Sequence, residues 1–162
     1  MHIREVNSSE LYIIHDLAER IWPSAYGEIV SAEQISYMLN WMYSTETLTQ
    51  QLADGHHFFL FEENGIPLGF IGIELFADLR LKIHKLYVLP ETQGKGIGKK
   101  LINFAREWAV HHGAKAIFLN VNRFNAAVQF YQHIGLTIIK TEDNEIGNGY
   151  LMEDYVMELK LT

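Results

Sequence analysis

The sequence of 162 residues contains no cysteine, only three prolines and no long apolar run. Without cysteine the chain can form neither a disulfide nor a thiolate metal site, and it has no cysteine nucleophile. The apolar stretches are too short to cross a membrane, and residues 1–6 read as a strand rather than a signal peptide. We therefore expect a cytoplasmic protein without a membrane partner. The length and the 48% hydrophobic content predict a single domain over residues 1–162.

Basic residues are scarce and unevenly placed, and the net charge is −7. Residues 1–79 carry twelve acidic and two basic side chains, residues 80–123 carry two acidic and nine basic, and residues 124–162 carry six acidic and two basic. A nucleic-acid-binding chain would show net positive charge or a basic stripe, so we expect no nucleic-acid partner. The basic central segment instead suggests a local anionic ligand.

The eight histidines do not suggest a metal site. His56–His57 and His111–His112 are adjacent pairs, whose side chains point apart on a strand or a helix. Neither a cysteine nor a His-x-x-x-His motif accompanies them. The sequence therefore predicts no metal.

The most informative segment is Leu86–Lys100, in which an apolar strand end leads through a turn rich in glycine and lysine into the start of a helix. Free backbone N–H groups converge at such a place, and glycine lets a ligand approach the backbone closely. Lysines at positions 95, 99 and 100 add cationic charge. The segment predicts a polyphosphate or pyrophosphate site, with an ordinary flexible loop as the alternative.

Two common phosphate motifs do not fit this turn. A nucleotide-hydrolysing loop would need glycine at position 93 and a hydroxyl at position 100, where the chain has Gln93 and Lys100. A dinucleotide fingerprint would need a third small residue where Lys99 or Leu101 stands. The pattern Gln-x-x-Gly-x-Gly over residues 93–98 resembles the GCN5-related N-acetyltransferase superfamily. In that family this turn binds the pyrophosphate of acetyl-coenzyme A.

The expected elements follow the same family order. Helices are expected from Ser8 or Ser9 to about Ile21, where Pro23 should end the helix, and over about 31–43, 44–54, 97–112 and 126–134. Strands are expected over 1–6, 58–62, 66–76, 79–88, 116–121, 136–141 and 150–159, with Asn64-Gly65 as a hairpin turn. The predicted fold class is α/β (α+β), with one mixed central sheet of about seven strands flanked by helices.

The resemblance implies a splay between the strands that end near Val88 and Val121, and the pantetheine arm of the cofactor should lie in this wedge. A second element, Asn125 with Phe130-Tyr131 and Gly135-Leu136, also resembles the family, although Asn125 precedes Tyr131 by six residues rather than the commoner seven. The resemblance implies that the following residues bind the cofactor: Leu86, Tyr87, Val88, Gln93, Gly94, Lys95, Gly96, Ile97, Gly98, Lys99, Asn125 and Tyr131.

Acetyl transfer to an amine needs a base for the amine, a stabilised oxyanion and an acid for the departing thiolate. The resemblance makes Tyr131 the candidate acid, and the alternative is a core stripe formed with Ala127 and Ile134. Glu74, in an otherwise apolar strand, is the candidate base, and His84 and Glu28 remain alternatives.

Aromatic and acidic side chains suit a cationic acceptor. The acceptor pocket should be formed by Trp22, Tyr26, Glu28, Tyr43, His84, Glu145, Tyr150 and Glu153, although Trp22 and Tyr43 could each be core residues instead. Residues 21–23 and 149–155 are similar to bacterial acetyltransferases of the polyamine type.

The sequence therefore predicts an acetyl-coenzyme A-dependent N-acetyltransferase that acts by direct transfer on a primary amine, such as a small polyamine. Two alternatives stay open: a sensor of the same fold that binds acyl-coenzyme A without turnover, and an enzyme that acetylates a protein or peptide. The acceptor's identity and a possible homodimer cannot be read from the sequence.

Overall fold

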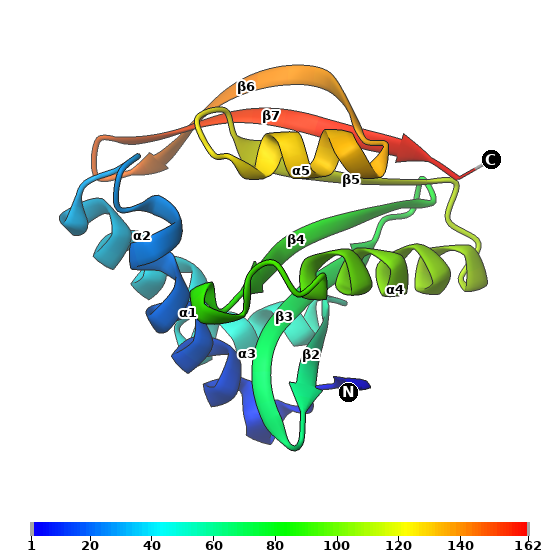
Figure 1. The fold of residues 1–162 in the computed structure, drawn as a ribbon. Helices are drawn as coiled ribbons and strands as arrows, with labels where there is room; N and C mark the ends of the chain where they lie inside the picture. The colour runs from blue at the N-terminus through cyan, green and yellow to red at the C-terminus, as the bar shows by residue number, and fades with distance from the viewer. Residues whose placement is uncertain (1, 162) are drawn as a thin grey trace.

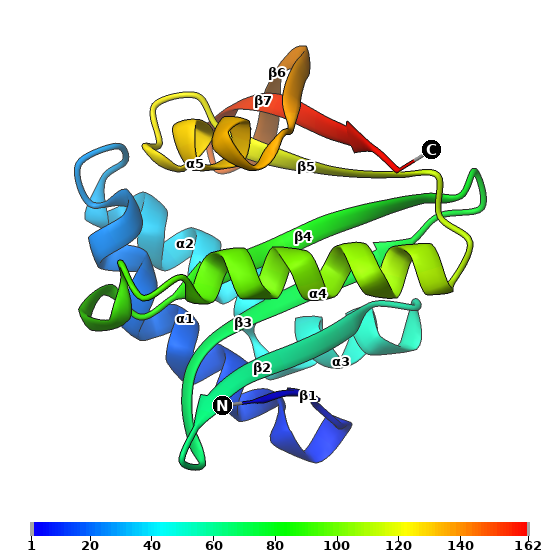
Figure 2. The same cartoon turned by 45° about the vertical axis from the view of Figure 1, so that its right-hand side comes forward.

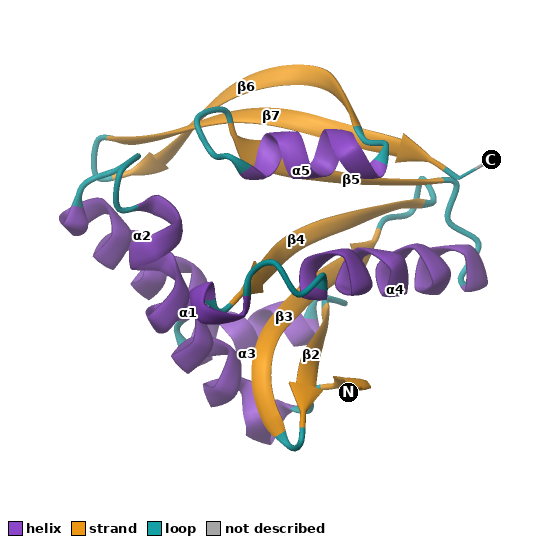
Figure 3. Ribbon diagram, in the orientation of Figure 1, coloured by secondary structure: helices purple, strands orange, loops and turns teal. Residues whose placement is uncertain are grey.

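The computed structural model describes residues 2–161, which form one mixed sheet flanked by helices (Figures 1 and 3). The predicted fold class is confirmed. The seven strands lie in the order β1-β2-β3-β4-β5-β7-β6. The strands are β1 (His2–Glu5), β2 (His57–Glu63), β3 (Ile66–Leu75), β4 (Arg80–Val88), β5 (Ala116–Asn122), β6 (Thr137–Gly147) and β7 (Tyr150–Lys160). The helices are α1 (Leu11–Tyr26), α2 (Ala32–Tyr43), α3 (Thr45–Ala53), α4 (Ile97–His111) and α5 (Ala127–Ile134).

The parallel pair β4 and β5 interrupts an otherwise antiparallel sheet. These two strands pair only from Arg80 opposite Ala116 to Ile83 opposite Leu119, although β4 continues to Val88. Figure 1 shows them side by side near the start of β4 and separating toward the turn before α4. The expected splay is therefore present, and it leaves one backbone edge of the second half of β4 without a strand partner.

Helices cover both faces of the sheet, α4 on one face and α1–α3 on the other (Figure 2). The core under α4 and α5 includes Ile71, Ile83, Leu101 and Tyr131. The core under α1–α3 includes Trp22, Tyr43, Phe58 and Phe70. The separate cores follow from strand alternation, because neighbouring residues of one strand point to opposite faces.

The prediction that Pro23 ends the first helix is wrong, because α1 continues to Tyr26 with Pro23 inside it. Proline removes one helical hydrogen bond and crowds the preceding turn, at a cost of about 3 kcal/mol. Continuing the helix buries the rings of Trp22 and Tyr26. Burial of a large apolar side chain contributes about 1.5–3 kcal/mol, so two rings can offset the proline.

Two further boundaries differ from the prediction. The helix α1 begins at Leu11, after Glu10, and is not capped by Ser8 or Ser9. A short 3-10 helix over Ser8–Glu10 precedes it and is capped by Asn7, whose Oδ1 accepts a hydrogen bond from the Ser9 N–H at 3.0 Å. The sixth strand extends to Gly147 rather than to Thr141. Its acidic residues lie on an edge strand, where charge on the exposed face is tolerated and discourages pairing with other chains.

The Asn64-Gly65 hairpin is confirmed, because both residues have positive φ angles, 53° and 76°, as a tight turn between β2 and β3 requires. Among the residues that the structure describes, no helix is both long and apolar enough to span a membrane.

Candidate active site

A cavity of about 820 Å³ opens where β4 and β5 separate. It is bordered by β4, the turn after it, the start of α4, the end of β5 and α5. Nearly all residues expected to bind a cofactor line this cavity: Leu86, Tyr87, Val88, Gln93, Gly94, Gly96, Ile97, Gly98, Lys99, Asn125 and Tyr131. Lys95 lies exposed in the same turn. The fold thus brings together two motifs that are about 30 residues apart in the sequence.

The turn has the backbone geometry of an anion site. Gly94 and Gly96 have φ angles of 88° and 76°, in the left-handed region that favours glycine. Gly96 directly precedes α4 and its carbonyl accepts the N–H of Lys100 at 3.1 Å. The first N–H groups of a helix have no acceptor within the helix and carry partial positive charge. A Cβ built at Gly96 would meet nothing within 4 Å, so only the φ angle and a ligand limit this position.

Several basic residues of the segment 80–123 lie away from the glycine turn. The Lys85 ammonium is buried, donates to Gln51 Oε1 at 3.1 Å and lies 5.0 Å from the centre of the Tyr43 ring. Burial lowers the pKa of Lys85 to about 8. Arg80 and Lys82 line a separate groove. The local cationic charge at the turn therefore comes from Lys95, Lys99 and Lys100, which are exposed there.

Tyr131 projects from α5 into the cavity while remaining 7% exposed. Burial, and secondarily the nearby Tyr26, raises the pKa of its phenol above the usual value. The phenol therefore stays protonated at neutral pH. Asn125 holds the start of this helix, because its Oδ1 accepts the Ala127 N–H at 2.8 Å.

An aromatic wall closes one side of the cavity. The hydroxyl groups of Tyr26 and Tyr87 are 2.8 Å apart, and both residues line the cavity. Trp22 lies behind them, with ring centroids 4.5 Å from Tyr26 and 5.7 Å from Tyr87. Its relative exposure is 0%, and that of Tyr43 is also 0%. Neither ring has surface that an acceptor could contact, so Trp22 and Tyr43 are core residues rather than pocket residues. Trp22 packs behind Tyr26 and Tyr87.

Glu74 and His84 are joined across β3 and β4. The His84 Nε2 atom lies 2.9 Å from Glu74 Oε1, and His84 also lines the cavity. A β-bulge creates this contact: Gly72 pairs with Lys85 and Ile73 with Ile83, which leaves His84 as the extra residue. Burial raises the pKa of Glu74 and lowers that of His84 to about 2, with the charge of Lys82 adding to the latter effect.

His56 completes this cluster and was missed by the sequence reasoning. Its Nε2 lies 3.1 Å from Glu74 Oε1, and its ring stacks on His84 with centroids 4.4 Å apart. His57 points elsewhere, to Glu5 and Trp108, so the expectation that adjacent histidines point apart is confirmed for this pair. It is wrong for His111 and His112, whose ring centroids lie 5.3 Å apart in an edge-to-face contact. No sequence spacing links His56 with His84, because the contact depends on the packing of three strands.

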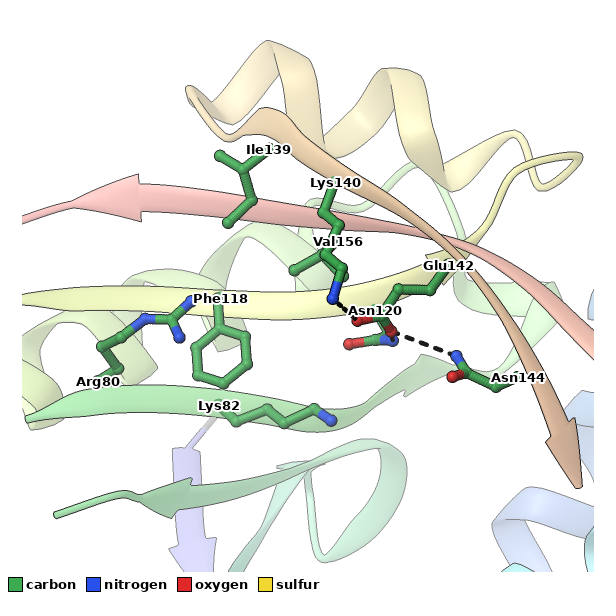
Figure 4. Close-up of a pocket in the computed structure, with 9 residues that line it drawn as sticks. All are labelled: Arg80, Lys82, Phe118, Asn120, Ile139, Lys140, Glu142, Asn144 and Val156. Carbon is green, nitrogen blue, oxygen red and sulfur yellow. Dashed lines mark hydrogen bonds and ion pairs between the residues drawn. The ribbon is translucent and has the colours of Figure 1, made fainter. Parts of the chain in front are cut away.

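A second, shallower groove of about 450 Å³ lies beside the cavity (Figure 4). Figure 4 shows Lys82 extended along it with its ammonium end toward Asn120, and β6 passing over it. Asn120 lines both the groove and the cavity, and its Nδ2 donates to Glu142 at 3.1 Å and to Asp154 at 3.3 Å. The two hollows therefore meet at Asn120, which the sequence did not single out.

The remaining acceptor candidates are spread around this region. Glu28 follows α1, is exposed and lines the cavity. Tyr150 packs on Tyr37 of α2 with ring centroids 5.4 Å apart. Glu153 lies 3.8 Å from Arg123, and Glu145 is exposed on β6. Only Glu28, Tyr26 and His84 of the predicted acceptor residues line the cavity itself.

The glycine turn at the start of α4, the separated strands β4 and β5 and the buried Tyr131 are the features that the resemblance to the acetyltransferase superfamily implies. The sequence model of the Acetyltransferase (GNAT) family matches residues 11–136. The chain therefore belongs to this family and is an N-acetyltransferase.

The individual proteins that this chain resembles in sequence and structure include other acetyltransferases. The spermidine N(1)-acetyltransferase of Thermoplasma acidophilum is 28% identical over 160 residues, which are 94% of this chain and 96% of that protein. An uncharacterised N-acetyltransferase of Methanocaldococcus jannaschii is 33% identical over 105 residues, 60% of this chain, and the match spans only 44% of that longer protein. The crystal structure of the PaiA N-acetyltransferase of Thermoplasma acidophilum with coenzyme A superposes with a TM-score of 0.83 at 26% identity, covering 98% of both chains.

Proposed function

We propose that the protein transfers the acetyl group of acetyl-coenzyme A directly to the primary amine of a small molecule. The observation that carries this proposal is the shared cavity, in which the pyrophosphate-type turn, the free edge of β4 and the buried Tyr131 phenol lie together. The same turn in Gln93–Lys99 would bind the pyrophosphate, and the pantetheine arm would lie along Leu86–Val88.

The proposed reaction has three steps, of which the first and the last transfer protons. The acceptor ammonium loses a proton to Glu74, relayed by His84, which contacts Glu74 at 2.9 Å and lines the cavity. The free amine attacks the thioester carbonyl, and the resulting oxyanion accepts hydrogen bonds from β4 N–H groups that β5 does not use. The carbon–sulfur bond then breaks as Tyr131 gives its proton to the thiolate. The acylated nitrogen loses its remaining surplus proton to solvent, which returns a proton to the Tyr131 phenolate and leaves a neutral amide.

We propose a cationic amine, such as a polyamine, as the acceptor class. Glu28 supplies a carboxylate at the cavity, and Tyr26 and Tyr87 supply aromatic surface that suits an organic cation. The spermidine acetyltransferase relative over nearly the full chain supports the same class. Asp154 and Glu142, joined through Asn120, place carboxylates where the groove meets the cavity, and Lys82 and Lys140 offset part of their charge.

An acceptor panel tests this function. Coenzyme A release from acetyl-coenzyme A would be measured with polyamines, amino acids, aminoglycosides and peptides, and products would be identified by mass spectrometry. The proposal expects the highest kcat/KM with a polyamine. A peptide as best acceptor would favour the protein acetyltransferase. Background release with every acceptor, in protein that binds acetyl-coenzyme A, would favour the sensor.

A further inference from the structure

Three potential metal ligands from three segments converge beside the cavity. His56 immediately precedes β2, Glu74 lies near the end of β3, and His84 lies in the bulge of β4. One ligand atom from each residue lies within 4.8 Å of the other two. Glu74 Oε1 is the shared point, 2.9 Å from His84 Nε2 and 3.1 Å from His56 Nε2.

These separations are close to those of a tetrahedral metal site. Zinc bonds of about 2.0–2.1 Å to nitrogen and oxygen place neighbouring ligand atoms about 3.3 Å apart. Both contacts of Glu74 already have that length within a few tenths of an ångström. The two imidazole nitrogens need to close from at most 4.8 Å, a change of about 1.5 Å or less that rotation of the stacked rings about their side-chain bonds can supply.

The types and exposure of the ligands also suit a metal. Two histidines and one carboxylate form a common three-ligand set that leaves a position for water or another ligand. Their side chains are 11% (His56), 21% (Glu74) and 21% (His84) exposed, so an ion can enter while the protein still shields the site. The strand backbones that carry Glu74 and His84 are paired with each other, which fixes their relative position.

We propose that His56, Glu74 and His84 bind a divalent transition-metal ion of the zinc type, against the expectation from the sequence that no metal binds. This site does not depend on the acetyl-transfer proposal. Lys82 and Lys85 lie within electrostatic range of His84, so binding should be weaker than at a site with acidic surroundings. A bound ion would occupy the lone pair of Glu74 that the proposed reaction uses, and would thereby slow acetyl transfer.

Calorimetry with Zn²⁺, without substrate, tests the site on the full-length chain freed of affinity tags. We expect one ion per chain, and a loss of affinity of about 100-fold or more in His56→Ala and in Glu74→Gln, beyond the 10–100-fold typical of outer-shell changes. His57→Ala is the matched control, because His57 is the adjacent histidine and contacts Glu5 instead. Its affinity for Zn²⁺ should equal that of the parent.

Co²⁺ absorption provides a second readout that does not require a variant to fold. The parent should show the intense visible bands of a four-coordinate Co²⁺ site, displaced by Zn²⁺, and circular dichroism should confirm that each variant is folded. Absence of Zn²⁺ binding to the parent would overturn the proposal. Equal Zn²⁺ binding by the parent and a folded His56→Ala variant, or loss of binding in His57→Ala alone, would overturn it as well.

Discussion

Tyr131 is the residue on which the proposed chemistry depends most. It is buried, it lines the cavity, and it lies on a helix whose start is fixed by Asn125. The sequence could indicate this tyrosine because its motif is local, with Asn125, Tyr131 and Gly135 within eleven residues. It could not indicate His56, because that contact is made across strands. For Trp22 the sequence left the acceptor pocket and the core both open, since an aromatic residue near a pocket can line it or lie behind its lining, and the structure buries it.

Tyr131→Phe should lower kcat by ~10²- to 10⁴-fold, the usual contribution of a positioned general acid, and leave affinity for coenzyme A nearly unchanged. Steady-state kinetics and calorimetry would measure the two quantities. Tyr43→Phe is the control, because Tyr43 is also buried but lies outside the cavity lining. A kcat loss below about threefold in Tyr131→Phe would favour the packing role instead.

The pH dependence follows from the burial of Tyr131. Its raised pKa means that the phenol keeps its proton above the ordinary value of about 10, so the acid form persists throughout the range from pH 7 to 10. At saturating acceptor, kcat of the parent should show no decline due to Tyr131 in that range. A decline with a midpoint below pH 10 that disappears in Tyr131→Phe would contradict this assignment.

Some secondary-structure elements around the site depend on adjacent residues alone, and others depend on packing against distant parts of the chain. The glycine turn, the start of α4 and the hairpin at Asn64-Gly65 were predictable because each depends on adjacent residues. The continuation of α1 past Pro23 was not, because burial of Trp22 and Tyr26 outweighs the local preference of proline. The length of β6 was missed for a similar reason, since its pairing with β7 overrides its polar composition.

Gly96→Ala separates ligand contact from backbone strain. Gly96 and Gly113 have φ angles of 76° and 79°, at the start and just after the end of the same helix, and a Cβ at either position would meet no protein atom within 4 Å. Alanine in this conformation costs about 1–2 kcal/mol, so both variants should lose similar stability in urea denaturation.

Of these two glycines, Gly96 lines the cavity and Gly113 does not, so only Gly96→Ala should weaken binding of coenzyme A, by roughly tenfold or more, since the added Cβ would occupy the space of the pyrophosphate. Calorimetry with coenzyme A would compare Gly96→Ala with Gly113→Ala. Equal affinities in the two variants would argue against the turn as the cofactor site.

Charge is divided across the whole molecule. The segments 1–79 and 124–162 are acidic, whereas 80–123 is basic, and part of that basic charge is buried or turned toward the groove rather than the turn. The sequence therefore predicted that positive charge is concentrated in residues 80–123, but not where that charge lies on the folded protein. The fold places Arg80, Lys82 and Lys85 away from the turn. A cationic acceptor would be attracted by the carboxylates around the cavity mouth.

Added salt should raise the KM of a polyamine more than that of a neutral amine, at saturating acetyl-coenzyme A, because surface fields are screened over ~8 Å at physiological ionic strength. Glu28→Gln should reduce this salt response, since Glu28 lines the cavity. Glu46→Gln, which changes an exposed acid of α3 outside the cavity lining, should leave it unchanged. Identical salt responses for all acceptors and variants would show that these acidic residues are only a solvated surface.

The central claim is that the cofactor lies between the separated strands, and a crystal structure with coenzyme A tests it most directly. We predict that the pyrophosphate accepts hydrogen bonds from backbone N–H groups of the turn at Gly94–Lys99. The pantetheine arm should follow Leu86–Val88, with its sulfur beside the Tyr131 hydroxyl. Coenzyme A bound outside this cavity, or bound in it with the sulfur far from Tyr131, would contradict the account.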